Sequence, residues 1–446
     1  MWSSISLFLS ISLFAVSDAN HYSLQPEELT LQNDENLRLV FATAIWRHGD
    51  RTAGGSPLLE NDKLKEEDWK QGGGGFNQLT PIGMKQHFDL GRKLRSRYIS
   101  SNFLSSRYRA NEIYVRSTDT NRTLTTAYAN LAGMYSNQKS NKPGYDYPIS
   151  SEWPLGWVPI PVHTVFYPTD HELQPDTKCR RLSELIELIS DSDEMKEYTS
   201  RSDIEKVLDY LSDNLGVRMS LDMWMYFVND SMLVEHIHFN DTKPKNDNAS
   251  HISEWYPWYW SGDYPSRLKA LNDKLFNFNE GQGNPKGING IDVSLEIPRL
   301  RAGETMRTIR MHAEGVLHCY RRKHFNDDAY HCESFFTNLK YYALSAHDST
   351  LNAVLALLGT REHVLLYGNP QYAAALLIEF YIDDSTQQTF VKFLYHADEN
   401  ENFRVITPFV SFCNGYNAYC PIENFIDVVD RYDPVDIELL CNTPLP

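Results

Sequence analysis

Residues 37–51 read LRLVFATAIWRHGDR, an apolar run that ends abruptly in two arginines, a histidine and an aspartate. A continuous apolar run of this length is typical of a strand that is buried on both faces of a parallel sheet. Beyond the run, Arg47, His48 and Arg51 share one short turn. Either this turn is simply solvated, or an anionic group binds there.

Two further apolar runs end in polar residues of the same kind. Residues 111–115 lead into Arg116, and residues 340–346 lead into His347 and Asp348. In parallel sheets, ligands bind outside the carboxyl ends of the strands. We therefore expect the three polar ends to lie on one edge of a sheet.

The order of the remaining patterns predicts the fold class. Helical patterns at 123–135 and 349–359 follow the second and third runs, and this alternation predicts an α/β fold with a doubly wound, mostly parallel sheet flanked by helices. Residues 373–383 and 389–397 predict an antiparallel hairpin at the sheet edge. Residues 171–295 carry mainly helical patterns, which predict an inserted helical cap domain.

The two parts of the predicted α/β core are residues 20–170 and 296–446, on either side of the cap. Residues 1–19 predict a signal peptide, because their apolar segment ends in small residues and is shorter than the ~20 residues of a membrane span. No later segment reads as a membrane anchor. We therefore expect a secreted protein.

Charge and composition limit the possible partners. The 446 residues include 42 Lys and Arg against 59 Asp and Glu, which gives a net charge of −17. Such a charge disfavours nucleic acid and anionic membranes as partners. A local cluster of arginines is therefore more informative than it would be in a basic protein.

The cysteines and sequons fit an oxidising compartment. No Cys-x-x-Cys and no zinc-type Cys/His spacing occurs, so disulfides are expected rather than a metal site, with the pairing left open. The six cysteines are residues 179, 319, 332, 413, 420 and 441. Sequons predict glycans at Asn229, Asn240 and Asn248, whereas the sequon at Asn121 begins a predicted buried helix.

His236 and His238 are read as a surface pair, because a third metal ligand is not evident.

The arginines at the strand ends favour a phosphate group. A guanidinium offers a rigid fork of donors that matches phosphate oxygens. If the strand ends adjoin, Arg47, Arg51 and Arg116 converge, and a bound dianion would relieve their repulsion. For any single arginine, pairing with a carboxylate is the commoner role, but three of them beside two histidines favour an anion site.

His48 and Asp348 are the candidates for the chemistry. Flanking cations lower the pKa of a histidine, and a neutral imidazole is a competent nucleophile toward phosphorus. The alternative roles of His48 are general base and structural hydrogen bonding. Asp348 could donate a proton to a leaving oxygen if it is kept protonated, or it could cap the helix that follows.

Three short motifs carry a resemblance to a known family. RHGDR at 47–51, RSTD at 116–119 and SAHD at 345–348 resemble, in the same order, the signatures of the histidine acid phosphatases. This branch of the histidine phosphatase superfamily includes the prostatic and lysosomal acid phosphatases. Residues 78–98 and 157–165 are also similar to that family, so the resemblance covers nearly the whole mature chain.

The resemblance implies a secreted acid phosphatase that hydrolyses small phosphomonoesters through a phosphohistidine, without a metal or cofactor. His48 would be the nucleophile and Asp348 the proton donor. The implied phosphate ligands are Arg47, Arg51, Arg116 and His347. A possible homodimer is also implied. A catalytically silent phosphate-binding module is the rival from another class, but such a protein would ordinarily lack one of the two catalytic residues.

The resemblance also implies the disulfides Cys179–Cys441 and Cys413–Cys420, which leaves Cys319–Cys332 as the third pair. The membrane tail of some lysosomal relatives is missing, which favours secretion or, as the alternative, a soluble lysosomal protein. The basic pocket of the phytase branch is not evident, so inositol hexakisphosphate is not the expected substrate. Residues 255–260 (WYPWYW) could recognise a sugar or lipid, although packing within the cap is their more common role.

Overall fold

The structure is a computed structural model of the chain. It describes residues 36–55, 64–136, 139–154, 156–239, 256–282, 287–326, 329, 331–365 and 368–445. The predicted signal peptide at 1–19 and the sequons at Asn240 and Asn248 lie outside these residues.

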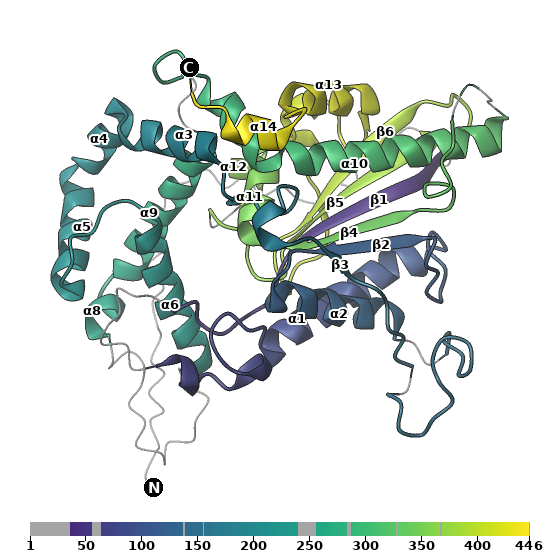
Figure 1. Ribbon diagram of the computed structural model, residues 1–446, viewed down its shortest axis with the longest axis horizontal. Coiled ribbons are helices and arrows are strands. Elements are labelled where there is room, and N and C mark those ends of the chain that lie inside the picture. The colour runs from purple at the N-terminus through teal and green to yellow at the C-terminus, as the bar shows by residue number, and fades with distance from the viewer. Residues whose placement is uncertain are drawn as a thin grey trace, which may run out of the picture. The chain divides into compact units, whose positions relative to one another are not determined.

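In the described part of the chain, eight strands form one sheet in the order β3–β2–β4–β1–β5–β6–β7, with β8 paired to β6 (Figure 1). The parallel strands are β1 (Leu37–Arg47), β2 (Ile113–Ser117), β3 (His163–Thr164) and β4 (Tyr341–Ala346). The antiparallel strands are β5 (Ala375–Asp383), β6 (Thr389–His396), β7 (Arg404–Val405) and β8 (Cys420–Pro421). The sheet is therefore mixed, with β1 between its parallel and antiparallel halves.

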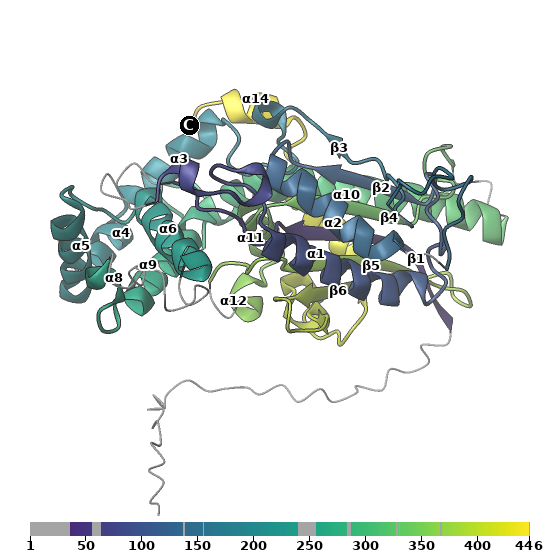
Figure 2. The ribbon, with the colours of Figure 1, turned by 90° about the horizontal axis from the view of Figure 1, so that it is seen from below.

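Helices cover both faces of the sheet, as the α/β prediction requires (Figures 1 and 2). One face packs against α1 (Pro81–Leu94) and α2 (Asn121–Tyr135). The other packs against α10 (Val293–Phe325), α11 (Asp348–Leu357) and α13 (Ile422–Tyr432). Because side chains alternate along a strand, β1 gives Ala44 and Trp46 to the first core and Phe41 and Ile45 to the second. Burial on both faces explains the continuous apolar run of β1.

Local signals set the ends of the helices that flank the site. Thr80 caps α1 by accepting a hydrogen bond from Gly83 N (3.2 Å), with Pro81 as the first helical residue. Gly359, at φ 64°, follows the end of α11 in the left-handed conformation. The N-cap of α11 is His347, and Asp348 is the first helical residue, so the alternative role of Asp348 as N-cap is wrong.

The segment predicted as a cap is helical between β3 and β4. Its helices are α3 (Arg180–Ser190), α4 (Asp193–Thr199), α5 (Ser202–Leu215), α6 (Met223–Phe239), α8 (Pro257–Trp260) and α9 (Tyr264–Asn279). Tyr259 of the Trp-rich segment is fully buried in a cluster with residues of α5 and α9. The described aromatic residues of this segment therefore contribute to internal packing. The domain boundaries remain a prediction, and the boundary at 295 falls inside α10.

Two short helices remain, α12 (Arg361–Val364) between α11 and β5, and α14 (Ile437–Asn442) after α13. Three disulfides are formed, and they are the expected pairs Cys179–Cys441, Cys319–Cys332 and Cys413–Cys420. The first of them joins the start of α3 to α14. Of the helices in the described ranges, none combines the length and apolar character that crossing a bilayer requires.

Helices α1 and α2 meet at two glycines. A Cβ atom on Gly91 would lie 2.1 Å from the carbonyl oxygen of Asn130, and one on Gly133 would lie 2.1 Å from that of Phe88. Both neighbours are backbone atoms, which cannot rotate away. The close approach of the two helices therefore depends on the missing side chains.

We expect Gly91→Ala to lower the free energy of unfolding by at least about 2 kcal/mol, because the added methyl group forces α1 and α2 apart. Urea unfolding measures this change. The matched control is Lys85→Ala on the exposed side of α1, which should change stability by less than about 0.5 kcal/mol. Equal losses in the two variants would contradict the packing argument.

Candidate active site

Backbone hydrogen bonds align the carboxyl ends of the three central parallel strands. His48 N donates to Ala346 O (3.0 Å), and Thr118 N donates to Ser345 O (3.1 Å). The ends of β1, β4 and β2 are therefore level to within about one residue. Most of the polar residues that follow them gather at one edge of the sheet, as predicted from the sequence.

The His48 side chain is buried and oriented by the backbone. Its Nδ1 lies 2.8 Å from the carbonyl oxygen of Gly49. A carbonyl can only accept, so Nδ1 carries the proton and the lone pair is on Nε2. Burial, followed by the charges of Arg122 and Arg47, lowers the pKa of His48 well below 6.5. The ring is therefore neutral, with a nucleophilic nitrogen available.

His347 stands next to this ring, with the two ring centroids 5.6 Å apart. Its Nε2 is 3.0 Å from Thr118 Oγ1 and its Nδ1 is 3.3 Å from an Arg122 guanidinium nitrogen. Burial, together with the charge of Arg122, lowers the pKa of His347 to about 3. Both histidines of the site are therefore uncharged when no anion is bound.

Arg47 and Arg51 lie at the site, as predicted, and each is paired with a carboxylate. Arg47 Nη2 is 3.2 Å from Asp348 Oδ2, and the guanidinium lies 4.4 Å from the ring centre of Tyr372. Arg51 Nη2 donates to Asp230 Oδ2 on α6 (2.8 Å). Each guanidinium has five N–H donors, so one ion pair leaves further donors for an anion.

Arg116 has a different place from the one predicted. Its two terminal nitrogens form ion pairs with Asp170 and Glu172, and these carboxylates satisfy its charge inside the protein. The two acidic residues belong to the turn that carries Gln174, whose Nε2 is 3.1 Å from His347 Nε2. Arg116 therefore supports the turn behind His347, which argues against its predicted role as a phosphate ligand.

Arg122 is the cation that the sequence reasoning missed. It is the second residue of α2, it is largely buried, and no carboxylate of the described chain forms an ion pair with it. Burial and the charge of Arg51 lower the pKa of Arg122 to about 10. A cation is also disfavoured near a helix N-terminus. This uncompensated charge indicates a missing anion.

The signal that could have identified Arg122 is its position. It follows the RSTD motif by three residues and lies in the first turn of the next helix, where acidic side chains are favoured. An arginine there is unusual unless it faces an anion. The sequence reasoning chose Arg116 because that residue lies at the predicted strand end.

Three donor groups contact the same carboxylate oxygen of Asp348. Its Oδ2 lies 2.9 Å from Asn369 Nδ2, 3.1 Å from the Tyr226 hydroxyl and 3.2 Å from Arg47 Nη2. Burial raises the pKa of Asp348, but the charge of Arg47 and the Asn369 hydrogen bond outweigh it and lower the pKa below 3.8. Without a ligand the carboxylate is therefore ionised, contrary to the expectation that it is kept protonated.

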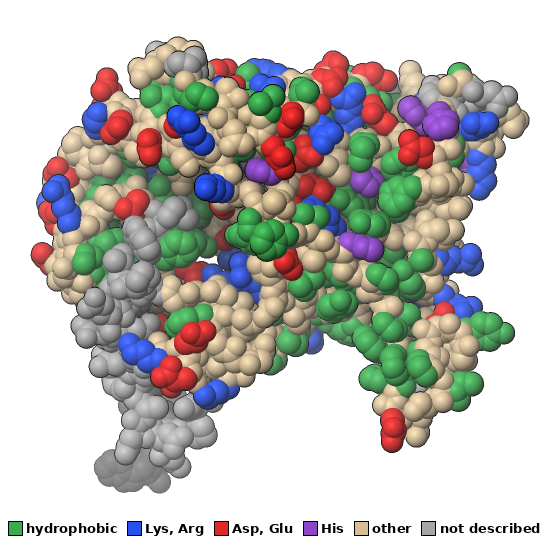
Figure 3. Space-filling view, in the orientation of Figure 1, with side chains coloured by type: hydrophobic (Ala, Val, Ile, Leu, Met, Phe, Trp, Pro, Cys, Tyr) green, Lys and Arg blue, Asp and Glu red, His purple; other side chains and the backbone are tan. Residues whose placement is uncertain are grey.

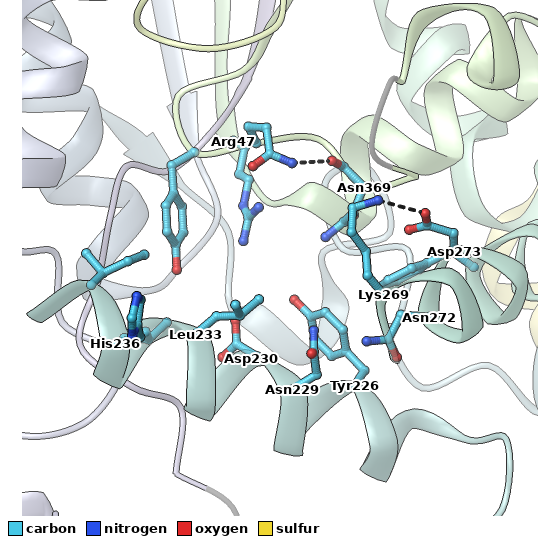
Figure 4. A pocket seen from close by; sticks show the side chains of 15 residues that line it. Arg47, Tyr226, Asn229, Asp230, Leu233, His236, Lys269, Asn272, Asp273 and Asn369 are labelled. Atoms are coloured by element: carbon cyan, nitrogen blue, oxygen red, sulfur yellow. Dashed lines mark hydrogen bonds and ion pairs between the residues drawn. The ribbon is translucent and has the colours of Figure 1, made fainter. Parts of the chain in front are cut away.

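A pocket of about 400 Å³ opens beside Arg47. In Figure 4, Arg47 projects toward α6, from which Tyr226, Asn229 and Asp230 point back. Helix α9 closes another side with Asn272. Figure 3 shows the surface hollowed at this place, with basic and acidic side chains inside the hollow. The inserted helices therefore form one wall of the site.

Two predictions for residues of α6 do not agree with the structure. Asn229 is buried and accepts a hydrogen bond from the Tyr259 hydroxyl (2.7 Å), which speaks against the predicted glycan. His238 is not on the surface, because its side chain is 5% exposed and its Nε2 lies 2.8 Å from Asp50 Oδ2. Within the described ranges, no cluster of His, Cys, Asp and Glu has the form of a metal site.

Comparison with known families identifies the family of the chain. The sequence model of the histidine phosphatase superfamily (branch 2) matches residues 38–396. This span contains both histidines, Asp348 and all four arginines described above. The chain belongs to the histidine phosphatase superfamily.

This histidine phosphatase is similar to several named proteins. Putative acid phosphatase 10 of Caenorhabditis elegans is 31% identical over 419 residues, which cover 92% of this chain and 95% of the relative. Prostatic acid phosphatase of Homo sapiens is 29% identical over 410 residues, which cover 91% of this chain and 88% of the relative. The solved phytase from Citrobacter braakii has a TM-score of 0.57 at 14% identity, covering 90% of this chain and 99% of the phytase. The last similarity confirms the predicted α/β fold.

We expect Arg122→Gln to weaken the binding of inorganic phosphate by about 10- to 100-fold, since a hydrogen bond to a charged group contributes about 1.5–3 kcal/mol. Isothermal calorimetry on the purified protein measures the dissociation constant. The matched control is Arg116→Gln, which should lower the melting temperature while changing phosphate affinity less. A greater loss of affinity in R116Q than in R122Q would contradict the assignment.

Proposed function

We propose that this histidine phosphatase hydrolyses phosphomonoesters through a covalent phosphohistidine at His48. The observation that carries the proposal is a neutral ring, with its Nε2 lone pair available, beside the uncompensated charge of Arg122. A phosphate group supplies both the missing negative charge and the electrophilic atom. A structural histidine would not need an anion site next to it.

Substrate binding would place the phosphate between the guanidinium groups and the two histidines. Its proposed ligands are Arg47, Arg51, Arg122 and His347. The bound dianion would offset the charge of Arg47 and thereby raise the pKa of Asp348 above its ligand-free value. Substrate would therefore bring Asp348 closer to the protonated state that an acid catalyst requires.

The reaction would proceed in two displacements. In the first, His48 Nε2 bonds to phosphorus while the bond from phosphorus to the ester oxygen breaks, and Asp348 gives its proton to the departing alcohol. In the second, a water oxygen displaces the histidine from phosphorus while Asp348 accepts a proton from that water. Asp348 then gives this proton to the departing phosphate, and both residues return to their ligand-free states, His48 neutral and Asp348 ionised.

Acidic conditions suit this scheme. The lowered pKa of His48 keeps the nucleophile neutral at pH values where an ordinary histidine would be protonated. Near or below its second pKa of about 6, a phosphomonoester carries a proton, which can pass to Asp348 on binding. The activity should therefore persist into the acidic range.

The names of the relatives and the disulfides support a location. Prostatic and lysosomal acid phosphatases are among the similar proteins, and three disulfides are typical of an oxidising compartment. We propose that the chain enters the secretory pathway and acts outside the cell or in the lysosomal lumen. Signal cleavage, glycosylation and a homodimer stay predictions.

We expect His48→Ala to lower kcat for p-nitrophenyl phosphate by at least about a thousandfold, because it removes the attacking atom. Calorimetry should show that phosphate still binds, since the cations are unchanged. His324→Ala, at an exposed histidine of α10, is the matched control and should retain activity. Full activity in H48A would end the proposal.

We expect Asp348→Asn to lower kcat for the hydrolysis of alkyl phosphates about 100-fold more than kcat for p-nitrophenyl phosphate. The reason is that only a poor leaving group needs a proton in order to depart. The measurement compares kcat for the two substrates in each protein. Asp263→Asn, at an exposed aspartate of the inserted segment, controls for the loss of one carboxylate. An equal loss for both substrates would remove Asp348 from the acid role.

A further inference from the structure

A chain of hydrogen bonds leads from Arg361 to Asp348. Arg361 Nε donates to Asn352 Oδ1 (3.0 Å), and Asn352 Nδ2 donates to Asn369 Oδ1 (2.6 Å). Asn369 Nδ2 then donates to Asp348 Oδ2 (2.9 Å). We call Arg361, Asn352 and Asn369 the relay. Asn369 lines the pocket beside Arg47 (Figure 4), so the relay connects a buried cation to the proposed proton donor at the pocket wall.

The guanidinium of Arg361 fixes the direction of these hydrogen bonds. An amide can turn either its donor or its acceptor toward a neighbour, whereas a guanidinium only donates. Because Arg361 donates, Asn352 must present its oxygen to Arg361 and its NH2 group to Asn369. Asn369 in turn must present its oxygen to Asn352 and its NH2 group to Asp348. Held in this way, Asn369 cannot accept a hydrogen bond from a protonated Asp348.

Arg361 is itself held by contacts of its two terminal nitrogens. Its Nη1 donates to Asn277 Oδ1 of α9, and its Nη2 donates to the carbonyl oxygen of Gly368. The residue is buried, and these hydrogen-bond partners are uncharged oxygens. An arginine with these two contacts could serve only to join neighbouring segments. That role does not account for the Nε contact, because Asn352 lies one turn after Asp348 on α11 and passes the hydrogen bond on.

The two carboxylate oxygens of Asp348 have different surroundings. Oδ2 contacts Asn369, Arg47 and the Tyr226 hydroxyl. Oδ1 accepts a hydrogen bond from the backbone N–H of Ser349 (3.0 Å). Arg47 can only donate, and the relay makes Asn369 a donor as well. A proton on Oδ2 would therefore meet two groups that cannot accept it, which leaves Oδ1 as the oxygen for a proton.

The relay keeps its influence on Asp348 when an anion is bound. Burial raises the pKa of Asp348, while the charge of Arg47 and then the Asn369 hydrogen bond lower it. A bound phosphate would offset the charges of the arginines, but it would not offset a hydrogen bond from a neutral amide. The titratable and charged groups that face Asp348 are Arg47, Arg51, Arg122, Tyr226 and His347.

We propose that Arg361 and Asn352 are positioning residues for the proton donor, because they fix Asn369 as a donor to Oδ2 and so leave Oδ1 to carry the proton of Asp348. The proposal rests on the proposed phosphatase function. In the first displacement the proton leaves Oδ1 for the ester oxygen, and in the second a proton from the attacking water arrives at Oδ1. Without the relay, Asn369 would be free to turn its oxygen toward Asp348, which would stabilise the protonated carboxyl group.

The test follows kcat for propyl phosphate against pH. The first displacement needs protonated Asp348, so kcat falls as the pH rises through the pKa of Asp348 in the substrate complex. Asn352→Leu frees the Asn369 amide and should move this alkaline limb to higher pH by about 0.5–1 unit, because the protonated form gains a hydrogen bond. The limb for p-nitrophenyl phosphate should move less than about half as far, since its leaving group needs no proton.

A double-mutant cycle separates this role from a general loss of stability. Asn369→Leu removes the donor itself and should also move the limb for propyl phosphate to higher pH. Adding Asn352→Leu to Asn369→Leu should change the limb by less than about 0.2 unit, because Asn352 acts only through Asn369. If Asn352→Leu does not fold, Asn352→Ala replaces it in both proteins.

Asn141→Leu is the matched control. It breaks two buried hydrogen bonds outside the relay, to the carbonyl oxygens of Tyr135 and Gly156, and should lower stability while leaving the limb in place. An unchanged limb in the Asn352 variant, or a shift that adds to that of Asn369→Leu in the double variant, would overturn the proposal. So would shifts of equal size for the two esters. Failure of the unmodified protein to hydrolyse p-nitrophenyl phosphate would instead refute the phosphatase function itself.

Discussion

The site depends on positive charge that is buried at the carboxyl edge of the sheet. Arg47, Arg51 and Arg122 are brought together there although guanidinium groups repel one another and are costly to remove from water. Asp348 and Asp230 compensate the first two, whereas Arg122 keeps an uncompensated charge. Burial, together with the charges of these arginines, lowers the pKa of both histidines and keeps them neutral. One electrostatic constraint therefore prepares the proposed anion site and the proposed nucleophile together.

The inserted helices take part in this balance. Asp230 of α6 holds Arg51, and Tyr226 of the same helix donates to Asp348. Arg51, a proposed phosphate ligand, and Asp348, the proposed proton donor, are thus both contacted by the inserted segment. The disulfide Cys179–Cys441 ties the start of this segment to α14 near the end of the chain. The inserted segment therefore supports residues to which the proposed function assigns the chemistry.

The contrast between Arg116 and Arg122 shows how strand register decides function. Arg116 pairs with Leu344, two positions before Ala346, the partner of Arg47. It is therefore further from the edge than the other arginines and is neutralised inside the protein by two carboxylates. Arg122, in the first turn of the helix that follows the strand, reaches the edge instead. Spacing along the sequence does not reveal this difference, because register depends on which strands pair.

The sequence by itself determined the α/β class, the three central strands and the positions of Arg47, Arg51, His48, His347 and Asp348. Those features follow from local patterns, since an apolar run predicts a buried strand and the residues after it must lie at the edge of the sheet. Only the tertiary structure decided the different surroundings of Arg116 and Arg122, the ionised state of Asp348 and the contacts that Tyr226 and Asn369 make with Asp348. Each of these depends on contacts between segments far apart in the chain, and on burial, which a sequence pattern does not specify.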